Sequence, residues 1–275
     1  MSVTEPTTDV PEPSGAPLVV GTLLAALIFF TRLPRPPLVA YHPAHDRNAA
    51  AFAPWIGILL GVFAAGALNL FTWQMPSLPA AALVVALLVW ITGALHEDGF
   101  ADFCDGFGTE RDRETTLAIM RDPRTGVFGV TGLVLLLLLK VSLLAALVDG
   151  LPFAAIPPVV IAACALSRFA AISFMQTMPY ARSDDEAARG RRLSTRMPWP
   201  WFTVAALGGL LPLAAASAWV SWTLVWVIPV SLLLRLWFAA SFMQRLRGYT
   251  GDCLGAVQKV TEVAVYLTVA VLWLR

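Results

Sequence analysis

A dense run of carboxylates is the feature of this chain best suited to chemistry. The run from 96 to 106 follows an apolar segment and contains Glu97, Asp98, Asp102 and Asp105. In a helix, a rotation of about 100° per residue places Asp98, Asp102 and Asp105 within a sector of roughly 60°. Such neighbouring like charges repel one another unless protons or cations lie between them, and carboxylate oxygens suit Mg²⁺ that also binds phosphate. The spacing therefore predicts a Mg²⁺ site on this stripe.

Glu97 lies about 100° away from that stripe, so we expect it to act either as a further ligand or as a base. His96 adjoins the run and is a candidate for contact with the substrate. The alternative is an interfacial helix whose acidic face is only solvated.

A second polar motif follows a short helix expected near 110–121 and precedes the next apolar segment. It reads Arg121-Asp122-Pro123-Arg124-Thr125-Gly126. Guanidinium groups here are suited to hold phosphate oxygens through paired hydrogen bonds. Anchoring of the membrane boundary by arginine is an equally good explanation of the bases. Arg182, after a helix stop, and Asp252, before the last apolar segment, are further candidates for substrate contact, although Asp252 also suits a helix N-cap.

The composition identifies the class of protein. Of 275 residues, 58% are hydrophobic and only 13% are charged, and the mean hydropathy is +0.72. Segments of about 20 apolar residues cross a bilayer as helices. We therefore predict an all-α, polytopic membrane bundle of about eight spans, with seven as the fallback. The segments lie near 17–31, 51–72, 79–95, 127–148, 153–178, 200–219, 222–243 and 256–274.

Charge is distributed unevenly between the connections. Four long connections, 32–50, 96–126, 179–199 and 244–255, hold 14 of the 19 basic residues, whereas the short connections hold none. The positive-inside rule places the long connections, and with them every polar motif, on the cytoplasmic face. Residues 1–16 predict a disordered acidic tail, and 17–275 a single membrane domain. The three cysteines predict neither a disulfide nor a zinc site.

Several ionisable residues fall inside the apolar segments, where they are rare and usually face a bundle interior or a polar cavity. They are Lys140, Arg168, Arg235 and Glu262. Lys140 lies too near the middle of its span to reach the interface easily, so we expect it to pair with Glu262 if those spans touch. Snorkelling to the interface is the alternative for Arg168 and Arg235.

Taken together, these motifs resemble the cobalamin synthase family, also called adenosylcobinamide-GDP ribazoletransferase. The resemblance follows the same order over nearly the whole chain beyond the tail. It is carried by Phe30-Thr31-Arg32-Leu33-Pro34, the 96–106 run, Met120 to Gly126, Ser167-Arg168, Met178-Pro179-Tyr180-Ala181-Arg182 and Thr250-Gly251-Asp252. Departures from the family pattern are Glu97 for an aliphatic residue, Phe100 for leucine and Pro123 for serine.

The resemblance implies a Mg²⁺-dependent enzyme of the bacterial inner membrane that acts late in assembly of the cobalamin nucleotide loop. It would join adenosylcobinamide-GDP to α-ribazole or α-ribazole 5′-phosphate and release GMP at the cytoplasmic face. A complex with other cobalamin-assembly enzymes is expected, and no nucleic-acid partner. The implied site consists of acids Glu97, Asp98, Asp102 and Asp105 and the substrate-binding residues His96, Arg121, Asp122, Arg124, Arg168, Arg182 and Asp252.

Two other classes fit parts of the pattern. Alcohol phosphotransferases and prenyltransferases also place spaced aspartates at a membrane surface to bind a metal diphosphate. A secondary transporter would use Lys140, Arg168 and Glu262 as coupling charges, with its substrate near the bilayer midplane.

Overall fold

The structure, a computed structural model, describes residues 14–34, 36–38, 40, 42–109, 112–182 and 196–273. Within these ranges the chain forms helices and no β-strand, which confirms the all-α prediction. Most of the predicted tail lies outside the described residues. The elements are α1 (Gly15–Phe30), η1 (Pro43–Phe52), α2 (Ala53–Thr72), α3 (Ser77–Thr92), α4 (Leu95–Phe107), α5 (Arg113–Ile119), α6 (Val127–Gly150), η2 (Phe153–Ala155), α7 (Ile156–Ile172), α8 (Phe174–Thr177), α10 (Trp199–Trp219), η3 (Trp222–Trp226), α11 (Val227–Leu246) and α12 (Gly251–Trp273).

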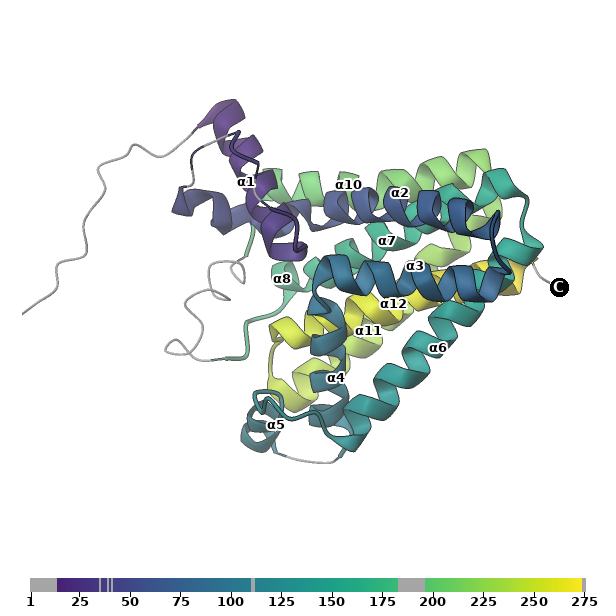
Figure 1. Cartoon of the computed structure of the whole chain (residues 1–275). Helices are drawn as coiled ribbons and strands as arrows, with labels where there is room; N and C mark the ends of the chain where they lie inside the picture. Colours follow the sequence, from purple (N-terminus) through teal and green to yellow (C-terminus); the bar gives the residue numbers. More distant parts are fainter. Residues whose placement is uncertain are drawn as a thin grey trace, which may run out of the picture.

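The number of apolar helices agrees with the predicted seven to eight spans. Among the described residues, six helical segments are long and apolar enough to cross a membrane, and the bent pair α3–α4 is a seventh candidate. The shorter apolar helix α1 occupies the first predicted span. Figure 1 shows the long helices running roughly side by side, with the turn between α2 and α3 at one end of the bundle and α5 at the other.

Helix α7 forms the centre of the bundle and packs against α2, α10 and α12. Two glycines of α2, spaced four apart, allow its backbone to approach α7 closely. A Cβ at Gly57 would lie 2.5 Å from the carbonyl oxygen of Cys164, and one at Gly61 would lie 2.7 Å from Cα of Ile161. The two glycines therefore allow α2 to pack directly against the backbone of α7.

A sharp bend separates the acidic run from the span before it. Helix α3 ends at Thr92, and the axis of α4 turns by 92°. Two successive left-handed residues make this bend, Gly93 at φ 66° and Ala94 at φ 58°. Glycine adopts this conformation without a steric penalty, whereas alanine pays about 1–2 kcal/mol. The apolar segment predicted over 79–95 therefore ends earlier, at Thr92, and α4 begins a separate helix across the end of the bundle (Figure 1).

Two buried ion pairs connect α4, α6 and α12. Lys140 of α6 lies 2.9 Å from Glu262 of α12, which confirms the predicted pair. Lys259 of α12 lies 2.5 Å from Glu97 of α4 and 3.9 Å from Glu262. All four side chains are at most 5% exposed. Since charge is costly in an apolar interior, these pairs strongly favour one arrangement of the three helices.

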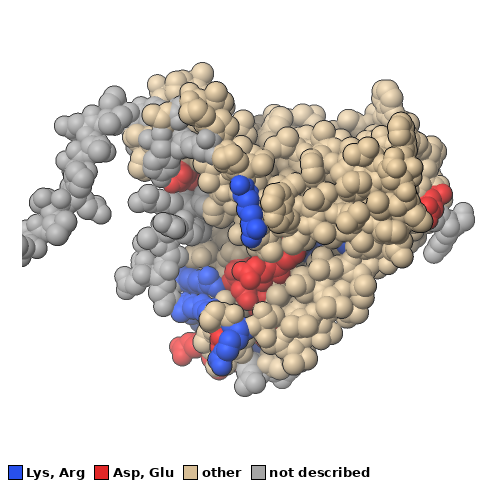
Figure 2. All heavy atoms as spheres, in the orientation of Figure 1, with Lys and Arg blue, Asp and Glu red and all other residues tan. Residues whose placement is uncertain are grey.

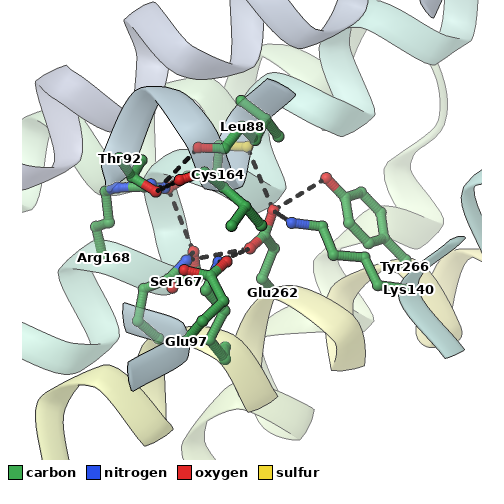
Figure 3. Close-up of polar contacts among 12 residues, drawn as sticks. Leu88, Thr92, Glu97, Lys140, Cys164, Ser167, Arg168, Glu262 and Tyr266 are labelled. Carbon is green, nitrogen blue, oxygen red and sulfur yellow. Dashed lines mark hydrogen bonds and ion pairs between the residues drawn. The ribbon is translucent and has the colours of Figure 1, made fainter. Parts of the chain in front are cut away.

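Glu262 is the centre of a larger polar cluster (Figure 3). It accepts hydrogen bonds from Tyr266 Oη at 3.5 Å and from Gln258 Nε2 at 3.2 Å. Gln258 Nε2 also lies 3.1 Å from Ser167 Oγ on α7. The cluster therefore joins α6, α7 and α12.

We expect loss of one partner of the Lys140–Glu262 pair to destabilise the protein more than loss of both. Lys140→Met leaves Glu262 without its nearest cation, and breaking a buried pair costs about 3–5 kcal/mol. Lys140→Met/Glu262→Gln removes both charges and should recover part of that loss. The measurement is the thermal unfolding midpoint in detergent. Asp149→Asn, an exposed change at the far end of α6, is the control and should leave the midpoint nearly unchanged. Additive losses in the double variant would contradict the pairing.

Candidate active site

Helix α4 presents two different faces, as its amphipathic sequence predicts. His96 and Glu97 are buried against the bundle, whereas Asp98 is exposed and Asp102 and Asp105 are half-buried. The predicted separation of Glu97 from the aspartate stripe is therefore confirmed. Figure 2 shows acidic side chains gathered in a hollow of this face, with basic side chains above and below.

A cavity of about 200 Å³ opens beside the stripe. His96 and Asp98 of α4, Arg168 of α7 and Asp252 of α12 line it together. The structure thus brings four predicted site residues from three helices to one place. The remaining walls are mostly apolar or aromatic and include Phe29, Phe30, Leu95, Ala171, Ile172, Met175 and Tyr180.

Glycines allow α4 and α12 to meet closely at this cavity. A Cβ at Gly99 would lie 2.9 Å from Cα of Asp252, and one at Gly255 would lie 3.1 Å from the carbonyl oxygen of His96. The close approach places Asp252 near the aspartate stripe. Asp252 Oδ2 also lies 2.6 Å from Nη2 of Arg182, so its charge is largely compensated.

Asp98 and Asp102 are the carboxylates with oxygens left for a ligand. Neither side chain has a hydrogen bond or ion pair to any residue that the structure describes. Burial, together with the nearby carboxylates of Asp252 and Asp98, raises the pKa of Asp102 to about 7. A cation bound beside Asp102 would favour the ionised form of its carboxylate and so lower this pKa.

Asp105 has a different environment from the other two aspartates. Its Oδ2 accepts the N–H of Gly126 at 2.7 Å, and its Oδ1 accepts the N–H of Gly129 at 2.8 Å. These are among the first N–H groups of α6, which have no partner inside that helix. Asp105 therefore caps α6 from outside and fixes the arginine turn beside α4.

The arginine turn itself is open to solvent. Arg124 donates from Nε and Nη2 to the two oxygens of Asp122, at 2.9 and 2.6 Å. These hydrogen bonds lower the pKa of Asp122 to about 2. Arg121 is exposed on the same turn. Arg182 Nη2 lies 3.4 Å from the carbonyl of Met120, so the turn adjoins the Arg182–Asp252 pair even though it does not line the cavity.

The cluster behind the cavity contains residues that the sequence analysis did not single out. Lys259 and Gln258 lie close to the cytoplasmic end expected for the last span, where polar residues are common, and Ser167 entered only through the Ser167-Arg168 motif. Their spacing could have identified Gln258 and Lys259. They precede Glu262 by four and three residues and so share its helix face.

Sequence comparisons give the same family as the motifs. The profile of the cobalamin-5-phosphate synthase family matches residues 22–270. The chain belongs to this family. It is 37% identical to an adenosylcobinamide-GDP ribazoletransferase of Polaromonas sp. over 92% of this chain and 97% of that protein. Proteins with the same name from Ralstonia nicotianae and Vibrio cholerae are 40% and 35% identical, over 92% and 89% of this chain and 95% and 91% of theirs. No solved structure matches.

The different environments of Asp105 and Asp102 can be tested by hydrogen exchange. We expect Asp105→Ala to speed amide hydrogen exchange at residues 126–129 by about tenfold or more. The change removes two hydrogen bonds to a charged acceptor, each contributing about 1.5–3 kcal/mol. Asp102→Ala is the matched control, because Asp102 accepts no backbone N–H among the described residues. Equal exchange in the two variants would show that Asp105 does not hold this turn.

Proposed function

We propose that this chain joins adenosylcobinamide-GDP to α-ribazole or α-ribazole 5′-phosphate and releases GMP. The family match and the names of the relatives support this activity. The structural observation that carries it is the convergence of Asp98, Arg168 and Asp252, from three different helices, on one cavity. That convergence places carboxylates and a guanidinium group at one end of a membrane bundle. A reaction at a pyrophosphate requires both kinds of charge.

The proposed reaction is a displacement at phosphorus. A ribose hydroxyl attacks the cobinamide-side phosphorus of the pyrophosphate, and a new P–O bond forms. The bond between this phosphorus and the oxygen of the GMP phosphate breaks, its electron pair leaves with GMP, and the proton of the hydroxyl passes to solvent water. Such chemistry depends mainly on positioning and on neutralising charge at the bridging and leaving oxygens.

Mg²⁺ is part of the proposal, and the carboxylates fit it. Among the described residues, no group of three His, Cys, Asp or Glu side chains is arranged to hold a metal alone. Mg²⁺ does not need such a group, because it commonly takes one or two carboxylates and fills its other positions with phosphate and water. Asp98 and Asp102 are suited to this role. When bound there, the ion would neutralise charge on the pyrophosphate oxygens.

The basic residues divide into two groups in this scheme. Arg182, held beside Asp252, adjoins the stripe and is placed to meet a phosphate. Arg121 and Arg124 lie further out, where an incoming phosphate would have to compete with Asp122 for Arg124. A phosphate could replace Asp122 at Arg124 at little cost, because exposed ion pairs are weak. We assign Glu97 to holding α4 through Lys259 rather than to proton transfer, because it is buried and paired.

Asp102→Asn should reduce GMP release by at least about 100-fold under saturating Mg²⁺. The amide keeps the shape of the side chain but loses the negative charge that a divalent ion requires. The assay uses membranes with adenosylcobinamide-GDP and α-ribazole, with insertion checked by the unfolding midpoint. Asp149→Asn makes the same chemical change far from the site and should retain full activity. Activity of Asp102→Asn within a few-fold of the parent would exclude the metal role.

Two of the three candidate coupling charges, Lys140 and Glu262, do not favour a transporter. Lys140 and Glu262 pair with each other at 2.9 Å and are at most 2% exposed, and neither lines the cavity. Coupling charges of a transporter are expected beside a substrate path near the midplane. A phosphotransferase with another alcohol substrate remains distinguishable by its leaving group, since only the proposed reaction releases GMP.

We further propose that the α4 end of the bundle faces the cytoplasm of a bacterial inner membrane. The support is the concentration of arginine at this end, which includes Arg113, Arg182 and Arg245 among the described residues.

Introduced cysteines test this orientation, in a chain with Cys104→Ser because the other two native cysteines are buried. Ala118→Cys, exposed on α5, should react with an impermeant maleimide in inside-out vesicles and not in spheroplasts. Gln74→Cys, exposed between α2 and α3 at the opposite end, should show the reverse pattern. Labelling of Ala118→Cys in spheroplasts would overturn the orientation.

A further inference from the structure

A second cavity, larger than the one beside the aspartate stripe, lies between α4, α6 and α11. Its volume is about 520 Å³, within the roughly 300–1,000 Å³ of pockets that hold small molecules. Helix α4 contributes Phe103, Cys104 and Phe107 to its lining. On a helix these positions are turned by at least about 100° from each aspartate of the stripe. The two cavities share no lining residue, so this one lies on the opposite side of α4.

Packing of α4 against α6 and α11 closes the inner side of this cavity. A Cβ at Gly132 of α6 would lie 2.6 Å from Sγ of Cys104, so α6 packs directly on α4. The ring of Phe103 lies 5.7 and 6.0 Å from the rings of Phe238 and Phe242 on α11. The inner wall is therefore apolar and aromatic.

The outer side of the cavity is open. Phe128, Leu135 and Trp237 line its edge and are exposed. They belong to α6 and α11, two of the helices that are long and apolar enough to cross a bilayer. In a membrane, the opening between these spans faces the acyl chains of the lipid.

The polarity of the lining changes along the cavity. Arg245 and Gln244 lie in the last turn of α11, and Thr131 lies in the second turn of α6. This polar end is at the α5 end of the bundle, where α6 begins (Figure 1). Leu135 and Trp237 lie deeper in the spans, by roughly 6–12 Å at 1.5 Å per residue. The gradient matches a molecule with a polar head and an apolar tail.

Arg245 supplies positive charge at the polar end. Its Nη1 donates to the carbonyl of Thr109 at 2.7 Å, and its Cζ lies 5.6 Å from the centre of the Phe107 ring. Its Nε and Nη2 have no acceptor among the described residues, and the side chains of Thr131 and Gln244 have no hydrogen bond to them. None of the described residues that line the cavity is acidic. Several donors around one uncompensated cation suit a phosphate.

We propose that this cavity binds one anionic glycerophospholipid. Its phosphate accepts hydrogen bonds from Arg245, and an acyl chain lies against Phe103, Leu135 and Trp237. Basic pockets between membrane helices recognise anionic headgroups in this way. The bound lipid packs against α4 from the side opposite the aspartate stripe, and so supports the helix that carries the stripe. The proposal does not depend on which reaction the chain catalyses.

The first test compares two lipids on the unaltered chain by native mass spectrometry. The protein is stripped of lipid in detergent, and phosphatidylglycerol or phosphatidylcholine with the same acyl chains is added. We expect one phosphatidylglycerol per chain, bound at least about fivefold more tightly than phosphatidylcholine, because one arginine near an anionic headgroup contributes about that factor. Equal affinities for the two lipids would overturn the proposal.

The second test assigns the preference to Arg245. Arg245→Gln should weaken binding of phosphatidylglycerol by at least about fivefold and leave that of phosphatidylcholine nearly unchanged. Arg245→Lys should keep part of the preference because it keeps the charge. Arg235→Gln is the matched control, since Arg235 is on the same helix but donates to Ser173 and Thr177 outside the cavity. An equal loss in Arg235→Gln and Arg245→Gln would show a general effect of charge and contradict a site at Arg245.

A third variant tests whether the lipid lies inside the cavity. Thr131→Trp places a large side chain in it and should weaken phosphatidylglycerol binding by about tenfold, because overpacking is costly. Leu138→Trp, two turns deeper on the same exposed face of α6 and outside the cavity, should bind the lipid normally. Equal binding by the two variants would place the lipid elsewhere.

The same spectra distinguish other occupants of the cavity. Release of bound phosphatidylglycerol by added adenosylcobinamide-GDP would assign the cavity to that substrate. A dimer that forms as the lipid is lost would assign it to a second copy of the chain. Either result would overturn the proposal. Should Thr131→Trp fail to insert, the comparison of Arg245→Gln with Arg235→Gln still decides.

Discussion

The interaction on which the site depends is the ion pair between Glu97 and Lys259. It joins α4 to α12 at 2.5 Å, beneath the surface that carries Asp98 and Asp102. Because an unpaired charge in this interior would be costly, α4 is held in one rotation about its axis. That rotation turns the aspartate stripe outward and His96 inward.

The bend before α4 is the second constraint, and it acts together with the first. Gly93 and Ala94 direct the acidic helix across the end of the bundle instead of letting it continue the span. A straight continuation would carry the stripe away from α12 and separate Asp98 from Asp252. The close contact at Gly99 and Gly255 is possible only with the bend in place, since it requires α4 to lie directly against the first turn of α12.

Sequence reasoning found the spans and the stripe because both follow from local periodicity. Apolar length gave the helices, and i, i+4, i+7 spacing gave the shared face of Asp98, Asp102 and Asp105. Charge rarity inside a span also predicted the Lys140–Glu262 pair. The pattern could not reveal that Asp105 caps α6 or that Lys259 holds Glu97, since both contacts depend on how two helices pack, which the spacing along one helix does not determine. The left-handed Ala94 was equally hidden, because alanine ordinarily continues a helix.

The structure separates two uses of charge that look alike in the sequence. Paired charges, such as Lys140 with Glu262, are enclosed and satisfied, and their value lies in fixing the helices. Three charges without an ion pair among the described residues, those of Asp98, Asp102 and Arg168, lie at or beside one cavity. In a membrane interior an unsatisfied charge is retained only where something gains from it. The acidic face of α4 and the buried Arg168 of α7 therefore meet at the same cavity.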